Sequence, residues 1–469
     1  MKKRQACGLH GLIGLCLAVL VLFITLMVDV PDGLTIEGRN TIGITIFFLI
    51  LLITEALPLP VSCLLTIGLT PLFNVTERFA GAVVGFAHPV VFFILASFGI
   101  AGAIMNVPIT KRILSALLKQ AGYRIEMILL AMMITTAALS FFMSNVPTCA
   151  IMMSVALEFI NMLEDGEEKK SIGKAFMIAI PVATMIGGMA TPASSSLNLL
   201  AIGLLEQHTG QTVTFVQWMA IGIPLVVALI PFAWFLIIKV YKPAQIDREK
   251  TMIYIENVQV KEKVSGKEAY VIAIMAAALI LWIASSWVQG IEIFTVAILA
   301  CVLFFMPGIN VLSWDKFVTT INWDIIFISG TVLSTANALV ENNVSSWLVG
   351  MLYPANLALS TNMLVGLAAM VSFVMLLMIT SAPALITVLA GPFITIAMVG
   401  GAPPAYLIIA LAFCAGNCYL FPLDTVQLIT YGKGYYRMTD MCKSTIFLQI
   451  AIVAILMFWI PFMGGVLGI

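Results

Sequence analysis

The chain has 469 residues, of which 61% are hydrophobic and 10% are charged, and its Lys and Arg residues balance its Asp and Glu residues. A soluble domain carries about 25% charged residues, so the composition excludes a soluble protein and predicts an all-α polytopic membrane protein. The zero net charge gives no indication of a nucleic-acid partner. The eight Cys form no Cys-x-x-Cys pair, and with only three His the sequence predicts no transition metal and no cofactor.

The N-terminus carries basic residues at positions 2–4, followed by an apolar run over residues 12–30. This run is longer than the core of a signal peptide, and no Ala-x-Ala cleavage pattern follows it. Residues 1–39 are therefore expected to form an uncleaved transmembrane helix and a first external loop.

Two of the later apolar segments, 126–160 and 360–399, are interrupted near their middle by Ser, Asn or Pro, and we expect each to be a re-entrant hairpin. The other segments are expected to cross, which gives about 11 transmembrane helices plus two hairpins. Counted with the first run at 12–30, they lie near residues 40–56, 58–74, 90–108, 173–205, 218–240, 268–288, 291–307, 324–353 (segments 324–340 and 344–353 taken as one partly interfacial unit), 403–430 and 444–466.

The basic residues predict the orientation. With the N-terminus in the cytoplasm, every Lys and Arg falls on the inner side except Arg39 and Arg78, as expected for a cell-membrane protein. This topology places the C-terminus outside. The polar residues 242–267 are then a cytoplasmic linker between two halves.

The first interruption reads Ser144-Asn145-Val146-Pro147, and a comparable tip at residues 380–383 places Ser381 237 residues after Ser144. Each tip is followed by a helix with its own break, one around Ser194 and one around Asp424, which are 230 residues apart. Five crossings separate the two hairpins, so residues 40–241 and 268–469 are predicted to be inverted repeats. Paired broken helices in inverted repeats indicate a secondary transporter.

The polar groups at these breaks suit an anion together with a cation. Lys and Arg are absent from residues 125–168, 175–238 and 317–432, so an anion there would depend on the N–H groups at helix N-termini. Hydroxyl, amide and main-chain oxygens suit Na⁺. Coupled binding of a small anion and Na⁺ is therefore the expectation.

Ser140 and Ser144 share one helical face, and with Asn145 they offer oxygens to an ion; the alternative is that each Ser bonds to its own helix. Asp424 is the carboxylate placed at a break. It is expected to bind Na⁺ or accept a proton, or else to cap the helix after Pro422.

The chain resembles the divalent anion/sodium symporters, which carry dicarboxylates, citrate or sulfate. That family has Ser-Asn-Thr at each hairpin tip; here Val146 replaces the first Thr, and Ala382 and Pro383 replace the second Asn and Thr. The matching stretches are Thr54-Glu55-Ala56-Leu57-Pro58-Leu59, Leu139 to Asn145, Ile186 to Thr191 with Asn198, and Pro422 with Thr425.

The resemblance implies an elevator-type carrier that works as a homodimer. It implies a first Na⁺ site at Ser140, Ser144, Asn145 and Ser194, substrate contacts from Asn145, Val146, Ser195 and Thr425, and a second Na⁺ site at Thr380, Ser381, Ala382 and Asp424. The altered second tip raises the hypothesis that the Asp424 carboxylate replaces the lost amide.

Na⁺-coupled transport of a C4-dicarboxylate is the first reading. A Na⁺-independent or proton-coupled exchanger and a sulfate carrier are alternatives within the same fold. An ion channel is a remote alternative, because the sequence shows neither a Gly-rich selectivity filter nor an acidic ring. An enzyme would need a nucleophile–base pair that the sequence does not show.

Overall fold

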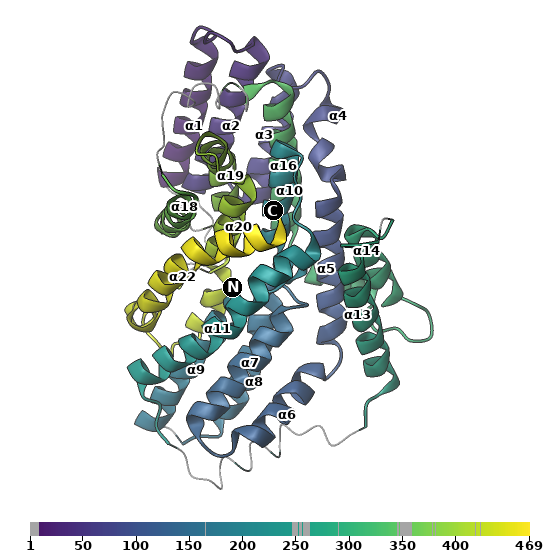
Figure 1. The fold of residues 1–469 in the computed structure, drawn as a ribbon, viewed down its shortest axis with the longest axis vertical. Coiled ribbons are helices and arrows are strands. Elements are labelled where there is room, and N and C mark those ends of the chain that lie inside the picture. The colour runs from purple at the N-terminus through teal and green to yellow at the C-terminus, as the bar shows by residue number, and fades with distance from the viewer. Residues whose placement is uncertain are drawn as a thin grey trace.

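The computed structural model describes residues 9–164, 166–245, 252, 256, 263–288, 290–344, 347, 359–377, 379, 381–417, 419–422 and 424–469. Within these residues every regular element is a helix (Figure 1). The predicted all-α class is therefore confirmed.

The N-terminal helices form a separate layer at one end of the molecule, where they pack with the later helix α16 (Figure 1). Thr35 caps α2 by accepting a hydrogen bond from the Gly38 amide, and Pro58 precedes α3. The elements are α1 (Leu9–Met27), α2 (Ile36–Thr54), α3 (Leu59–Leu72), α4 (Phe79–Ala82), the 3-10 turn η1 (Val84–Ala87) and α16 (Trp323–Glu341).

The middle of the chain contains the first hairpin and the first broken helix. α5 (Pro89–Met105) and α6 (Ile109–Ala121) meet at a 62° bend. The hairpin consists of α7 (Ile125–Ser140) and α8 (Asn145–Asn161). The broken helix consists of α9 (Glu167–Gly187), the turn η2 (Pro192–Ser194) and α10 (Ser196–Thr209), and the long α11 (Phe215–Tyr241) follows.

The last part of the chain repeats this order of hairpin, broken helix and long helix. α13 (Gly266–Ala284), α14 (Ile293–Leu303) and α15 (Trp314–Thr320) come first, beside α5. The second hairpin is α18 (Thr361–Leu376) and α19 (Ala382–Val399). The second broken helix is α20 (Pro404–Ala415) and α21 (Thr425–Tyr431), and α22 (Met438–Leu467) ends the chain.

Seven helices of the described residues are long and apolar enough to cross a membrane, or eight if the bent α5–α6 pair is one span. Shorter apolar helices, including both first arms of the hairpins, add to these. The chain is a multi-pass membrane protein. The number of eleven crossings, the repeat boundaries and the orientation of the termini stay predictions.

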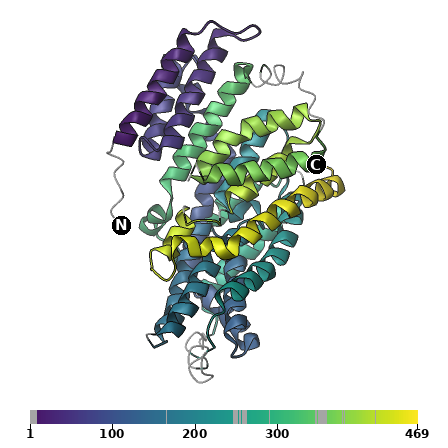
Figure 2. The ribbon, with the colours of Figure 1, turned by 90° about the vertical axis from the view of Figure 1, so that its left-hand side faces the viewer.

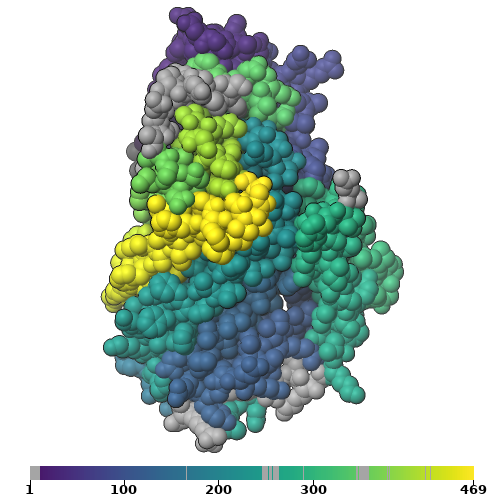
Figure 3. Space-filling view, viewed as in Figure 1, coloured from purple at the N-terminus to yellow at the C-terminus, as the bar shows by residue number. Residues whose placement is uncertain are grey.

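Burial identifies the central helix. In α9, 83% of the most apolar stretch is buried, whereas the corresponding value is 28% in α22 and 33% in α13. Figures 2 and 3 show α22 lying across the outside of the molecule, and Figure 3 shows α11 beside it. The broken helix that begins with α9 is therefore the element around which the candidate site is built.

Candidate substrate and ion site

The first hairpin tip places two oxygen-bearing side chains in the protein interior. Ser140 ends α7 and is fully buried, and Asn145 begins α8 and is 8% exposed. Neither Ser140 Oγ nor Asn145 Oδ1 has a hydrogen-bond partner in the protein. A buried oxygen without a partner costs about 1–3 kcal/mol. Such oxygens fit ligands of Na⁺, which binds to hydroxyl and amide oxygens.

Two glycines bring this tip against the first broken helix. A methyl group added at Gly187 would lie 2.8 Å from Ser140 Cβ, and one added at Gly188 would lie 2.6 Å from Asn145 Oδ1. Thr191 Oγ1 also donates a hydrogen bond to the Phe141 carbonyl at 2.9 Å. Only glycine permits the close contact, so Gly187 and Gly188 place Ser140 and Asn145 at the break.

The first break keeps its shape through its own polar side chains. Asn198 Nδ2 donates to the Gly188 carbonyl at 2.8 Å and to the Thr191 carbonyl at 3.0 Å. Ser194 Oγ lies 2.7 Å from the same Gly188 oxygen, and Thr191 Oγ1 accepts from the Ser194 amide at 3.0 Å. The Ser194 hydroxyl therefore holds the loop, and an ion contact from this residue would come from its main chain.

The long helix α11 supports the same break from outside, a role that the sequence analysis missed. The buried indole of Trp218 donates from Nε1 to the Met189 carbonyl at 3.1 Å. A methyl group added at Gly222 would lie 2.1 Å from that oxygen. No local pattern in the sequence predicts these contacts, because the partners belong to different helices.

The second break is supported in a comparable way by α22. Tyr419 donates its hydroxyl hydrogen bond to Asn417 Oδ1. Its amide donates to Gln449 Oε1 at 3.4 Å, and its carbonyl accepts from Thr445 Oγ1 at 2.8 Å. Gln449 lies 231 residues after Trp218, and each break is supported by the long helix that follows its broken helix. Tyr419 and Gln449 were also missed by the sequence analysis.

Asp424 is the N-cap residue of α21. Its Oδ2 accepts a hydrogen bond from the Val426 amide at 3.0 Å, and Gln427 completes the capping box. α21 packs against α8 and α9, and Cys149 Sγ of α8 donates to the Val426 carbonyl at 3.3 Å. One carboxylate oxygen of Asp424 thus caps α21, which the sequence analysis gave as the alternative to binding Na⁺ or a proton. A role for Asp424 toward a cation stays a prediction.

The second hairpin tip gives fewer oxygens. Ser381 is the N-cap of α19 but makes no side-chain capping hydrogen bond, and Ala382 is buried without a polar group. Thr380 lies outside the described residues. α19 packs against α20 and α10. The amide side chain that the first tip carries at Asn145 has no counterpart at Ala382.

The predicted site residues share one structural feature. Each described one, apart from Ser140 and Ser194, lies in the first turn or at the N-cap of a helix that follows a break. Ser144 caps α8 without a side-chain bond, Ser195 caps α10 by accepting from the Leu197 amide, and Thr425 begins α21 and is exposed. The set is Ser144, Asn145 and Val146 on α8, Ser195 on α10, Ser381 and Ala382 on α19, and Asp424 and Thr425 on α21.

The packing divides these breaks into two groups. The first hairpin packs against α9 and α21, and the second hairpin packs against α20 and α10. Each hairpin therefore contacts one part of each broken helix. Free N–H groups at helix N-termini favour anions. The arrangement therefore suits an acidic substrate even though the sequence places no Lys or Arg at the breaks.

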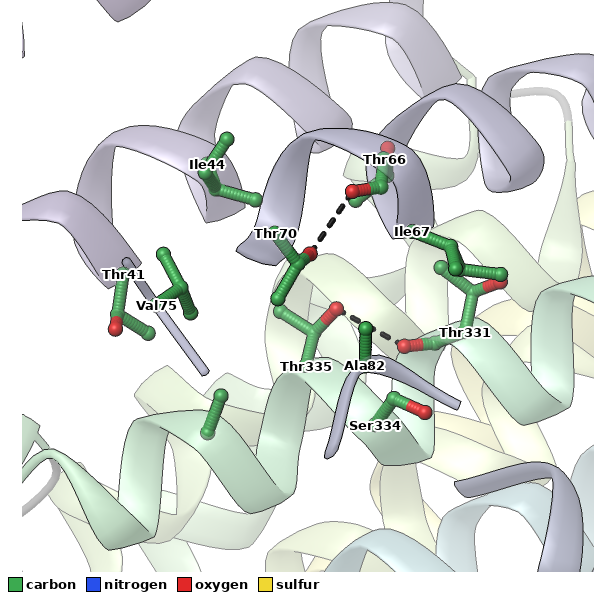
Figure 4. A pocket seen from close by; sticks show the side chains of 11 residues that line it. Thr41, Ile44, Thr66, Ile67, Thr70, Val75, Ala82, Thr331, Ser334 and Thr335 are labelled. Atoms are coloured by element: carbon green, nitrogen blue, oxygen red, sulfur yellow. Dashed lines mark hydrogen bonds between the residues drawn. The ribbon is translucent and has the colours of Figure 1, made fainter. Parts of the chain in front are cut away.

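A small polar cavity lies in the N-terminal layer, away from the hairpin tips. It lies between α2, α3 and α16, has a volume of about 10 Å³, and is lined by several hydroxyl groups (Figure 4). Thr70 Oγ1 donates to the Thr66 carbonyl at 2.8 Å, and Thr335 Oγ1 donates to the Thr331 carbonyl at 2.9 Å. This volume accommodates about one water molecule, so the cavity is too small for a dicarboxylate.

The chain has relatives along its whole length. It is 26% identical to the sodium-dependent dicarboxylate transporter SdcS of Staphylococcus saprophyticus, with 100% of this chain and 94% of that protein covered. It is also 26% identical to SdcS of Staphylococcus aureus, with 94% and 89% covered.

Two solved structures share the fold. The YdaH transporter of Alcanivorax borkumensis aligns with a TM-score of 0.57 at 13% identity, and the alignment covers 98% of each chain. MtrF of Neisseria gonorrhoeae, described with a class of antimetabolite efflux pumps, aligns with a TM-score of 0.59 at 13% identity, covering 96% of this chain and 94% of that one. At this identity the likeness concerns the fold.

Residues 10–469 match the family described as the sodium:sulfate symporter transmembrane region. This family and the relatives named above are transporters and not enzymes, in agreement with a hairpin tip and a broken helix meeting inside a multi-pass membrane protein. The chain belongs to the sodium:sulfate symporter family.

Proposed function

We propose that the protein is a Na⁺-coupled secondary transporter of C4-dicarboxylates. The observation that carries the proposal is the pair of buried oxygens without protein partners, Ser140 Oγ and Asn145 Oδ1, in contact with the break at Gly187 and Gly188. The names of the two SdcS relatives support the same substrate class and coupling ion.

The proposed roles of the site residues follow from their positions at the hairpin tip and the helix breaks. Ser140, Ser144, Asn145 and the main chain near Ser194 would hold Na⁺. Asn145, Val146, Ser195 and Thr425 would contact the substrate, whose carboxylates would face helix N-termini. The bound cation adds the positive charge that the basic side chains do not supply, so binding of anion and cation is expected to be mutually dependent.

Uptake by proteoliposomes tests this function. We expect saturable uptake of radiolabelled succinate that requires an inward Na⁺ gradient, with sulfate and citrate as poor competitors. Asn145→Ala should abolish uptake, whereas Ser154→Ala should leave it unchanged, because Ser154 lies on the exposed side of α8 and bonds only to the Ala150 carbonyl. Na⁺-independent uptake would contradict the proposal, and strong sulfate competition would favour a sulfate carrier.

An exchanger is the second candidate, and the second hairpin tip favours it. Ala382 and Pro383 offer no side-chain oxygen where the first tip has an amide, so the second cation site would be weaker or would depend on Asp424. Counterflow of succinate in Na⁺-free liposomes distinguishes the two candidates, since an exchanger gives counterflow there and an obligatory symporter does not.

We also propose an elevator-type motion in a homodimer, with the N-terminus in the cytoplasm and the C-terminus outside. Each hairpin packs against one part of each broken helix, which supports movement of these elements as one body relative to the α1–α3 layer. A Ser144→Cys reporter should react with membrane-impermeant thiol reagents from either side, depending on Na⁺ and substrate. Light scattering of the purified protein tests the dimer, and terminal reporter fusions test the orientation.

A further inference from the structure

A large apolar cavity lies between the N-terminal layer and the second hairpin. Its volume is about 870 Å³, and α2, α10, α16 and α19 contribute to its wall. Most lining residues are aliphatic, such as Leu49, Leu339 and Ile394. Cavities of about 300–1,000 Å³ accommodate ligands of drug size, and walls of this kind suit hydrocarbon rather than a dicarboxylate.

The cavity continues to the apolar surface of the protein. Ile24 and Val28 of the N-terminal segment line it and are 51% and 52% exposed, and Met398 at the end of α19 is 42% exposed. In a membrane protein such side chains face lipid tails. A lipid chain can therefore enter from the bilayer without crossing a polar surface.

Arg39 is the one Lys or Arg side chain among the described residues that line this cavity, and the other polar lining residues are His208, Trp347 and five threonines. Its guanidinium donates to the Val28 carbonyl at 2.9 Å and to Asn40 Oδ1 at 3.0 and 3.2 Å, and it forms no ion pair with the described residues. A guanidinium has five N–H donors, so donors remain. Arg39 also lies in the first turn of α2, where the helix dipole disfavours a cation.

A polar end opposite an apolar body is the pattern that a lipid requires. Trp347 also lines the cavity, and its indole Nε1 donates to the Asp32 carbonyl at 3.1 Å. Trp residues of this kind lie at headgroup level in membrane proteins. Arg39 and Trp347 thus mark the polar end of the cavity, where a lipid headgroup would lie, and the aliphatic wall forms the rest of it.

We propose that this cavity binds one anionic phospholipid, with its phosphate at Arg39 and its acyl chains between α2, α16 and α19. The charge of Arg39 selects an anionic headgroup, and the aliphatic wall accepts the chains. The bound lipid would fill the contact between the N-terminal layer and the second hairpin. The proposal concerns a site separate from the hairpin tips and does not depend on the transported substrate.

Gly391 of α19 gives a direct test. It lines the cavity, and a methyl group added there would meet no atom within 4 Å. Gly391→Leu therefore adds a side chain at a lining position where its Cβ meets open space, and removing a helical glycine favours the helix. Gly68→Leu is the matched control, because Gly68 is also helical, has open space and lies outside this cavity.

The experiment uses the delipidated full-length protein, titrated with phosphatidylglycerol or phosphatidylcholine and observed by native mass spectrometry. We expect one tightly retained phosphatidylglycerol per chain in the parent and in Gly68→Leu. Gly391→Leu should lose it, Gly391→Ala should retain it more weakly, and Arg39→Gln should bind it about fivefold more weakly, as for one basic residue at an anionic surface.

Each result decides for or against the site. Equal retention of the two lipids by the parent would overturn the role of Arg39, and retention by Gly391→Leu equal to the parent would overturn the location. If Gly391→Leu does not elute as a folded species, Gly391→Ala and Arg39→Gln decide the question. Binding unchanged in both of these would refute the proposal.

Discussion

The Trp218 indole donates a hydrogen bond to the Met189 carbonyl, 3.1 Å away, and so ties α11 to the break in the neighbouring helix. Met189 lies directly after Gly188, which contacts Asn145 at the hairpin tip. The position of the tip therefore depends on a side chain of α11 as well as on the break itself.

Trp218→Phe is expected to lower stability. The Met189 carbonyl would lose a donor in a buried position, which costs about 1–3 kcal/mol. The apparent melting temperature in detergent measures the loss. Trp314→Phe is the control, because Trp314 is 67% exposed and its stability contribution should be small. Equal melting temperatures for Trp218→Phe and the parent would contradict the support assigned to this bond.

Gly222→Ala adds only one methyl group, but it is expected to impair both transport and stability. The added methyl group would lie 2.1 Å from the Met189 carbonyl oxygen, so α11 or the break must shift. We expect loss of succinate transport, with reduced expression or thermal stability. Gly68→Ala, in open space, should behave as the parent. Normal transport by Gly222→Ala would mean that the site tolerates movement of α11.

Ser140→Ala and Asn145→Ala are expected to remove Na⁺ stabilisation without unfolding the protein. Ser140 Oγ and Asn145 Oδ1 have no protein partners to lose, so the ion-free melting temperature should change little. Ligands that bind only the folded state raise its stability. The parent should therefore gain melting temperature with Na⁺ relative to K⁺, and the variants should not. A Na⁺ shift retained in both variants would exclude these oxygens as ligands.

Asp424→Asn separates capping from ion binding. Asn is as good an N-cap residue as Asp, so α21 and the overall stability should be preserved. If the carboxylate binds the cation or a proton, the Na⁺ and pH dependence of uptake will change. An Asn variant with the Na⁺ and pH profile of the parent would leave Asp424 with the capping role alone.

Arg112 and Glu268 form an ion pair between α6 and α13, and the Glu268 side chain is fully buried. Arg112→Ala leaves that carboxylate unpaired, which costs about 3–5 kcal/mol for a buried pair. The double variant Arg112→Met, Glu268→Met should be more stable than Arg112→Ala. Lys111→Ala is the control, because the Lys111–Glu158 pair is exposed and such pairs contribute about 0–1 kcal/mol.

The sequence predicted the helical class, the two interrupted segments and their tips. Hydropathy sets the segments, and Ser, Asn, Gly and Pro interrupt them for local reasons, so Ser140 to Asn145 and the break near Ser194 were identifiable. The contacts that hold the breaks were not, because Trp218–Met189 and Tyr419–Gln449 join separate helices. Arg112 and Glu268 are likewise 156 positions apart in the chain.

The helices that support the two breaks also contact each other. α11 holds the first break, α22 holds the second, and Trp459 of α22 donates to the Ile221 carbonyl of α11 at 2.9 Å. The two breaks are thus supported by one pair of helices that pack against each other. Because α11 and α22 pack against each other, a displacement of either helix would reach both breaks.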